Sequence, residues 1–222
     1  LYQSVVIAPH LRKRLVAQQR DTATSLSLKV LKPLPTAFEW EHIEGLQIDW
    51  HELTECLMYD DVRNDLIAEA AYRDWAKGRS ILVATRRVVH AHILRDLLEE
   101  RGVTEVNLLT GDTNTNKVYT EKLIEGVLNR TVRAVIATVP AIKRGANLNP
   151  LSTLHLAMPV GNKKDLEQLI GRIRRRSNQK DQCTLVYYQD VKVPYLIRLF
   201  KRVVVPVMRK LRLPGCVDVY MA

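Results

Sequence analysis

The sequence contains few cysteines and no long uninterrupted hydrophobic stretch. Its three cysteines, Cys56, Cys183 and Cys216, lie far apart and lack the spacing of a metal site. An odd number of widely spaced cysteines is typical of reduced thiols, so we expect an intracellular protein without bound metal. No run of about 20 apolar residues is present, which argues against a membrane-spanning helix.

Acidic residues are also scarce relative to basic ones: 24 Asp and Glu stand against 34 Lys and Arg, a formal net charge of +10. This excess favours a polyanionic partner such as nucleic acid. Aromatic residues amount to 6% and form no stripe suited to base stacking, so we expect binding that is largely independent of nucleotide sequence. With 222 residues and 46% apolar content, the chain suffices for one large domain or a domain with an appendage.

Two sequence signatures of nucleotide binding, one for phosphate and one for Mg²⁺, are missing from the sequence. There is no G-x-x-x-x-G-K-[ST] loop to cradle a β-phosphate, and no apolar strand ends in a D-E-x-H-like acid cluster for Mg²⁺. The stretch Met58–Asp61 superficially resembles such a cluster, but it lies at an expected helix start. There, Asp60 or Asp61 is better interpreted as a helix cap.

Apolar runs and helical patterns alternate from residue 59 to residue 190. Short apolar runs predict buried strands, and the segments between them have helical periodicity. This order implies right-handed βαβ units, and we therefore predict an α/β fold with a parallel sheet flanked by helices. The expected strands are Ser80–Ala84, Val106–Leu109, Arg133–Ala137, Leu151–Ala157 and Thr184–Tyr188, and the expected helices are 60–77, Val88–Glu100, Val118–Leu128 and one containing Gln168.

The two ends of the chain are expected to lie outside this domain. Residues 1–58 form a small appendage in which Leu26–Leu31 and Thr36–Trp40 are expected to pair as an antiparallel element, followed by a helix at Asp49–Leu57. Residues 191–222 form a basic helical extension that Pro206 should kink or break. Its cationic face is interpreted as solvated, with a nucleic-acid contact as the second possibility. The start at Leu1 rather than methionine fits a fragment of a longer polypeptide.

Hydroxyl and cationic side chains follow three of the expected strands. In open α/β sheets, ligands gather at the carboxyl ends of strands, and such groups hold phosphates without reading bases. A single threonine there is more often a cap or turn residue, but three on one edge favour a phosphate-binding track. The candidates in these loops are Thr85, Arg86, Thr110, Gly111, Thr138, Lys143, Arg144 and Gly145.

The expected helix around Gly171 has the clearest functional pattern. Gln168, Arg172 and Arg175 are spaced i, i+4 and i+7, which places them on one face of a helix. Forked guanidinium groups beside an amide suit a multiply charged oxyanion such as a phosphate chain. A basic, solvated helix face is the alternative interpretation. Gly171 is a poor mid-helix residue, and its presence suggests close approach of a partner.

These stretches resemble the motifs of superfamily 2 helicases. Residues 137–147, A-T-V-P-A-I-K-R-G-A-N, resemble motif V, and residues 168–175 match the Q-x-x-G-R-x-x-R pattern of motif VI at all four defining positions. Residues 80–86 resemble motif IV, and residues 108–111 the following strand and loop. The order is similar to that of the second RecA-like domain of such motors, particularly the phage and repair DExH type. The resemblance covers roughly residues 60 to 190 and implies a prokaryotic or phage-infected cell.

The resemblance implies roles for individual residues. Arg172 and Arg175 would be arginine fingers that face the γ-phosphate of ATP, with Gln168, Gly145 and Asn147 near the nucleotide. Asn147 replaces the acid usual in motif V, and Arg174 stands where many relatives have glycine. The family implies that Thr138, Arg86 and Gly111 contact the nucleic-acid backbone. We expect Thr85, Lys143 and Arg144 to contribute to the same contacts because of their positions in the loops.

The missing signatures imply that a first RecA-like domain, in the same or an upstream polypeptide, holds most of the ATP and Mg²⁺. This chain alone is therefore expected to be inactive, with DNA favoured over RNA as the partner of the complete motor. The main alternative is a non-catalytic basic α/β module that only binds nucleic acid or protein. A Rossmann-type enzyme is disfavoured because the first βα turn, T-R-R-V-V-H, lacks the glycines of that fold.

Overall fold

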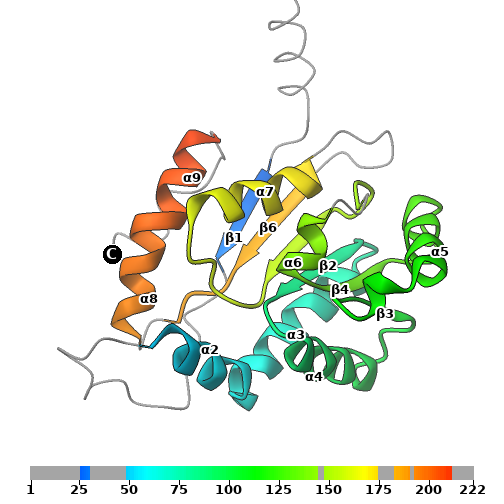
Figure 1. The fold of residues 1–222 in the computed structure, drawn as a ribbon, viewed down its shortest axis with the longest axis horizontal. Helices are drawn as coiled ribbons and strands as arrows, with labels where there is room; N and C mark the ends of the chain where they lie inside the picture. Colours follow the sequence, from blue (N-terminus) through cyan, green and yellow to red (C-terminus); the bar gives the residue numbers. More distant parts are fainter. Residues whose placement is uncertain (1–25, 31–48, 145–147, 175–182, 191–192, 212–222) are drawn as a thin grey trace, which may run out of the picture.

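A computed structural model of the chain describes residues 26–30, 49–144, 148–174, 183–190 and 193–211. Its centre is a six-stranded sheet, in the order β1-β6-β5-β2-β4-β3, in which every pair is parallel (Figure 1). This confirms the predicted α/β class. The strands are β1 Leu26–Val30, β2 Ile81–Thr85, β3 Val106–Leu109, β4 Ala134–Thr138, β5 Thr153–Leu156 and β6 Cys183–Tyr187.

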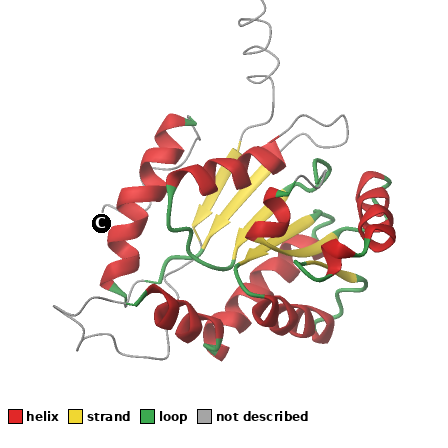
Figure 2. Cartoon of the chain, in the orientation of Figure 1, coloured by secondary structure: helices red, strands yellow, loops and turns green. Residues whose placement is uncertain are grey.

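Helices cover both faces of the sheet (Figure 2). Residues of α3 and α4 pack in one hydrophobic cluster, and residues of α2, α5, α6, α7 and the C-terminal helices pack in the other. Every residue of β2, β4 and β6 is buried, as expected for strands covered on both sides. The helices are α2 Trp50–Met58, α3 Asp61–Ala76, α4 Val88–Glu100, α5 Lys117–Leu128, α6 Val139–Lys143, α7 Lys163–Arg174, α8 Pro194–Leu199 and α9 Val205–Lys210.

Local signals account for most helix ends. The Asp60 carboxylate accepts a hydrogen bond from the backbone N–H of Arg63 at 2.9 Å, which confirms the capping interpretation of Met58–Asp61. Gly78 and Gly102, which follow α3 and α4, have φ angles of 82° and 87° that favour glycine. Helix α6 lies within residues 138–147, for which the sequence predicts a loop.

The strand near residue 26 belongs to the main sheet, a position that the sequence did not predict. β1 lies at an edge of the main sheet and runs parallel to β6, from Leu26 opposite Cys183 to Val30 opposite Tyr187. An alternating pattern predicts a strand but carries no information about its partner, and β6 offers a row of backbone hydrogen-bonding groups at that edge. Residues 36–40 lie outside the described ranges. The division at residues 58 and 190 stays a prediction.

The C-terminal helices form one continuous run, Pro194–Lys210, whose middle turn is a π-helix at Phe200–Val204. There the N–H of Val205 bonds to the carbonyl of Phe200, five residues earlier. Pro206 has no N–H and clashes with the carbonyl four residues back, so local widening accommodates it without a break. This run docks on the domain, because its apolar residues belong to the core: Leu196, Leu199, Val203, Val204, Val207 and Met208. None of the helices in the described ranges is long and apolar enough to cross a membrane.

Candidate functional site

The two best-matching motif stretches contact each other in the structure. Helices α6 and α7 lie side by side (Figure 1), and Arg172 on α7 donates a hydrogen bond from Nη2 to the backbone carbonyl of Lys143 at 3.2 Å. The residues are 29 positions apart in the sequence. The fold therefore places the end of α6, which belongs to the motif V stretch, against the cationic end of α7.

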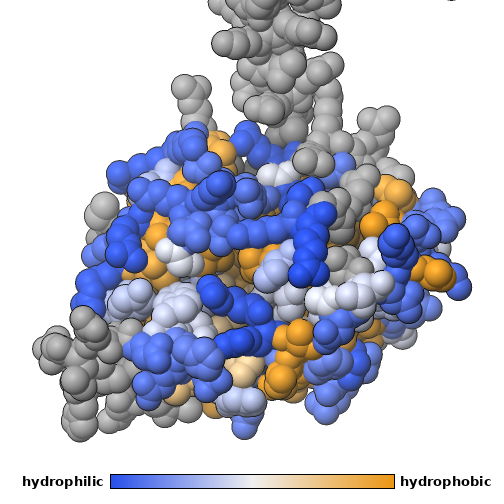
Figure 3. Space-filling view, viewed as in Figure 1, coloured by the Kyte–Doolittle hydropathy of each residue, from blue (hydrophilic) through white to orange (hydrophobic). Residues whose placement is uncertain are grey.

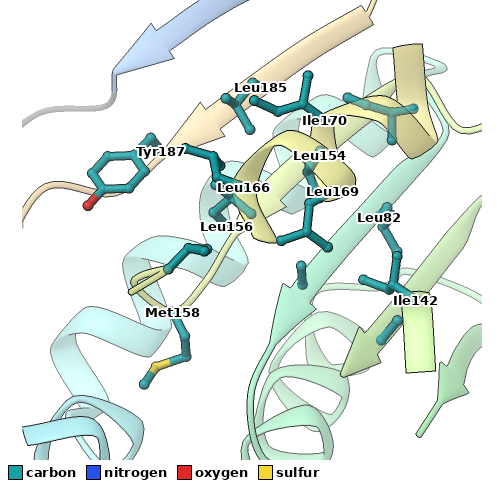
Figure 4. Packing of buried hydrophobic residues seen from close by; sticks show 14 of the residues in the cluster. Leu82, Ile142, Leu154, Leu156, Met158, Leu166, Leu169, Ile170, Leu185 and Tyr187 are labelled. Atoms are coloured by element: carbon teal, nitrogen blue, oxygen red, sulfur yellow. The ribbon is translucent and has the colours of Figure 1, made fainter. Parts of the chain in front are cut away.

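The apolar stripe of α7 sets which side chains point outward. Leu166, Leu169 and Ile170 point toward Leu154 and Leu185 of the sheet (Figure 4). Gln168 is therefore exposed and Arg172 half-buried. Hydrophilic residues cover the outer side of α7 (Figure 3). The helix thus presents an amide and a guanidinium group together, as its sequence predicted.

Gly171 is exposed, and among the described residues a Cβ atom built at this position would meet no heavy atom within 4 Å outside its chain neighbours and its own helix backbone. Packing within the chain therefore does not require glycine here. Because glycine in a helix costs roughly 0.5–1 kcal/mol relative to alanine, its presence favours an external group that approaches the backbone closely. The structure leaves room for that group.

An ion pair anchors the same region. Lys143 Nζ contacts the carboxylate of Asp165 near the start of α7, and the backbone N–H of Asp165 donates to Asn162 Oδ1 at 2.8 Å. Partial burial alone would raise the pKa of Asp165, but hydrogen bonds with Lys143 and Asn162 and the nearby Arg86 cation lower it overall. The charge of Lys143 is thus engaged within the chain, whereas Arg144 beside it is exposed.

The threonines at the strand ends align as expected but are not surface groups. Thr85 lies directly opposite Thr138, and Thr110 follows the neighbouring strand. Thr85 is 0% and Thr138 4% exposed, and the Thr85 hydroxyl contacts His90 Nδ1 at 2.6 Å. Thr110 bonds with Thr113 across a turn. The Thr85 hydroxyl is buried against His90 and is not accessible to a phosphate, contrary to expectation.

Arg86 is exposed at the carboxyl end of β2. Its guanidinium carbon lies 5.4 Å from the centroid of the Trp50 ring, a cation–π contact, and the Trp50 ring lies 6.0 Å from that of Tyr195. Gly111, after β3, is half-exposed with open space around it. Sequence reasoning missed Trp50, because nothing in its local pattern shows that it meets a residue 36 positions later.

Buried polar contacts connect the carboxyl ends of the strands to α3. His90 Nε2 lies 2.8 Å from Asn64 Oδ1, and the Asn64 amide donates to the Met58 carbonyl. Burial, together with the charge of Arg63, lowers the pKa of His90 to about 3, so its imidazole is neutral. His90 therefore has a role in the core. Within the described ranges, no cluster of three or more His, Cys, Asp or Glu is placed to hold a metal.

Three predicted site residues lie outside the described ranges: Arg175, Gly145 and Asn147. The described members fall into two groups. Arg172 meets the end of α6 at Lys143, and Gln168 and Gly171 lie on the same helix as Arg172. Arg86 belongs to a second group with Trp50 and Tyr195. The electrostatic influence of Arg86 on Asp165 links the two groups.

Comparison with known proteins gives relatives of low sequence identity. The sequence matches no protein-family model. It is similar to the transcript termination protein A18 of Yaba-like disease virus, with 28% identity over 141 residues, which cover 62% of this chain and 29% of that protein. The chain thus spans less than a third of this curated relative.

Solved structures resemble the chain more extensively. T4 UvsW superposes with a TM-score of 0.61 at 19% identity, over 76% of this chain and 36% of that one. The ATP-dependent Type ISP restriction-modification enzyme LlaBIII, solved bound to DNA, superposes with a TM-score of 0.56 at 14% identity, over 88% of this chain and 14% of that one. The chain shares a RecA-like α/β fold with these structures.

Proposed function

We propose that this chain is the second motor domain of an ATP-dependent nucleic-acid helicase or translocase. The observation that carries the proposal is the hydrogen bond from Arg172 to the Lys143 carbonyl, which brings the motif V and motif VI stretches together. In a motor of this kind, those stretches face the nucleotide across the cleft from the first domain. The RecA-like fold and the motif order support the same conclusion.

The chain's own residues fit a phosphate chain held by another domain. Mg²⁺-ATP, when bound, supplies the phosphoryl group and its charge. Arg172 uses one N–H on the Lys143 carbonyl, which fixes the guanidinium and leaves further donors for an anion. Together with Arg175, it stabilises negative charge that develops during phosphoryl transfer. We expect Gln168, Gly145 and Asn147 beside the nucleotide, and Gly171 leaves room for close approach.

The nucleic-acid track is expected along the carboxyl edge of the sheet. Arg86, Arg144 and Gly111 are accessible there and contact the sugar-phosphate backbone, with DNA favoured over RNA. The buried Thr85 and Thr138 hydroxyls shape the strand ends instead, although the backbone around Thr138 stays part of the proposed track. Lys143 acts mainly through its ion pair with Asp165.

ATP hydrolysis measured with and without DNA tests this function. The 222-residue chain would be assayed alone and joined to a first RecA-like domain encoded upstream, with single- and double-stranded DNA. We expect no turnover alone and DNA-stimulated turnover when joined. Arg172→Lys and Arg175→Lys should abolish that turnover, because lysine lacks the forked geometry.

The matched control is Arg73→Lys, which changes an exposed arginine on α3 that pairs with Glu69. It should leave turnover unchanged. Turnover by the chain alone, lost on Arg175→Ala, would contradict the proposed division between two domains. If neither the chain alone nor the joined protein hydrolyses ATP while salt-sensitive DNA binding is retained, the chain is only a nucleic-acid-binding module.

A further inference from the structure

The outward side of the C-terminal helical run carries several cations with no acidic residue among them. Leu196, Leu199 and Val203 point into the core, whereas the arginines and lysines between them stay in solvent. The sequence contains no acidic residue from Val191 to Leu213. The exposed cations, called here the C-terminal cationic face, are Arg198, Lys201, Arg202 and Arg209.

Several cations elsewhere on the surface are paired with acidic side chains. Arg73 contacts Glu69 within α3, Arg95 contacts Asp96 within α4, and Arg101 contacts Asp65. In the described part of the chain, no acid lies within salt-bridge distance of the four residues of the C-terminal cationic face, whereas Lys210 at its end pairs with Glu167 at 2.8 Å. The face therefore keeps four charges available for an external anion.

The position of this face links it to the proposed track. Tyr195, in the first turn of α8, contacts Trp50, and Trp50 in turn stacks against Arg86 at the end of β2. Arg198 and Arg202 follow Tyr195 at i+3 and i+7, which places both on the helix face of Tyr195 at increasing distance from this contact. The cationic face thus begins where the proposed nucleic-acid contacts at the sheet edge end.

We infer that the C-terminal cationic face is a second binding surface for the nucleic-acid backbone, which extends the track from Arg86 along α8 and α9. This inference rests on the proposed function. Arginine and lysine side chains without acidic neighbours release counterions from phosphates and read no sequence. Such a surface lengthens the bound segment of nucleic acid.

The salt dependence of DNA binding tests the inference. The 222-residue chain would be titrated, without nucleotide, against a fluorescent single-stranded oligonucleotide at several salt concentrations. Each lost phosphate contact reduces the magnitude of the negative slope of log K against log salt, called here the slope, by roughly 0.7. A variant with Arg198, Lys201, Arg202 and Arg209 all changed to Gln should lower the slope by roughly 2 to 3. Circular dichroism would verify that it is folded.

The matched control removes the same charge from another part of the molecule. Arg73, Arg95, Lys117 and Lys122, on α3, α4 and α5, would be changed together to Gln. Figure 1 shows α5 near β3, at one edge of the sheet, and α8 and α9 toward the opposite edge. We expect this variant to keep nearly the full slope. An equal fall in both variants would overturn the inference, because net charge alone would then explain binding.

Arg86→Gln separates this inference from the proposed function. If Arg86→Gln weakens DNA binding but the C-terminal variant does not, the extension is refuted and the track at the sheet edge stands. If the chain binds no oligonucleotide at all, both fail. If the C-terminal variant lowers the slope while the joined motor still depends on Arg172 for turnover, both are supported.

Discussion

Arg63 on α3 and Asp190 beyond β6 form a salt bridge in the interior of the domain. Arg63 Nε lies 2.8 Å from Asp190 Oδ1, and both side chains are only 1% exposed. Arg63 Nη1 also donates to the Ala157 carbonyl at 2.7 Å. One guanidinium therefore ties α3 to the segments that follow β5 and β6, at the edge of the sheet where the functional loops lie.

Removing one partner of this pair should strongly destabilise the protein. Asp190→Ala leaves the buried Arg63 guanidinium without its counter-charge, and we expect a loss of about 3–5 kcal/mol in the free energy of unfolding. Urea denaturation followed by circular dichroism measures this loss. Glu69→Ala is the control, because its pair with Arg73 is exposed and should contribute under about 1 kcal/mol. Similar losses in the two variants would disprove the structural role of Arg63.

Acid should destabilise the domain through His90. Its pKa is lowered from 6.5 to about 3 by burial and by the charge of Arg63, so the folded protein keeps the imidazole neutral. The unfolded chain binds a proton below about pH 6.5, so stability falls as pH decreases from there towards 3. One such proton contributes about 1.4 kcal/mol per pH unit.

The dependence of unfolding free energy on pH, measured between pH 7 and 4, tests this role. His90→Gln removes the titrating group and should flatten the slope by about one proton, whatever its effect on absolute stability. His92→Gln, at an exposed position on the same helix, should leave the slope unchanged. An unaltered slope in His90→Gln would show that other groups determine the acid sensitivity.

Gly171→Ala should separate folding from function. In the described part of the chain, no heavy atom beyond its chain neighbours and its own helix backbone lies within 4 Å of the added Cβ, so helix propensity should raise stability by up to about 1 kcal/mol. In the joined motor the same methyl group should lower ATP turnover, because it occupies the space left for close approach. Thermal unfolding and ATPase assays measure the two effects.

Gly126→Ala is the contrasting substitution on α5. Its Cβ would lie 2.6 Å from Val132 Cγ2, so this variant should lose stability. If Gly171→Ala leaves turnover unchanged, the glycine has no role in approach of the nucleotide.

Trp50 should influence DNA binding through Arg86. The cation–π contact at 5.4 Å orients the guanidinium, and such contacts contribute about 0.5–1 kcal/mol at exposed sites. Trp50→Ala should therefore weaken DNA binding roughly 2- to 5-fold, whereas Trp50→Phe retains a ring and most of the affinity. In an Arg86→Gln background, Trp50→Ala should have little further effect. Additive losses would show that Trp50 acts by another route.

The sequence predicted the elements from residue 60 onward closely, because their signals are local. Val88–Glu100 and Val106–Leu109 have the expected bounds, and Asp60 caps α3 as its position suggested. The outward placement of Gln168 follows equally from helical periodicity. The sequence did not predict helix α6, because helical periodicity is not detectable over its five residues.

Only the tertiary structure decided which residues meet across long separations. Periodicity and capping determined the order of strands and helices, and the motif spacing determined the resemblance. The parallel pairing of β1 with β6, the burial of Thr85 and the contacts of Arg63 with Asp190 and of Trp50 with Arg86 depend on how the sheet is assembled. Such contacts join segments whose local patterns are independent of each other, so no local pattern predicts them. The sequence by itself determined which residues could form the site. Packing determined which of these residues remain accessible.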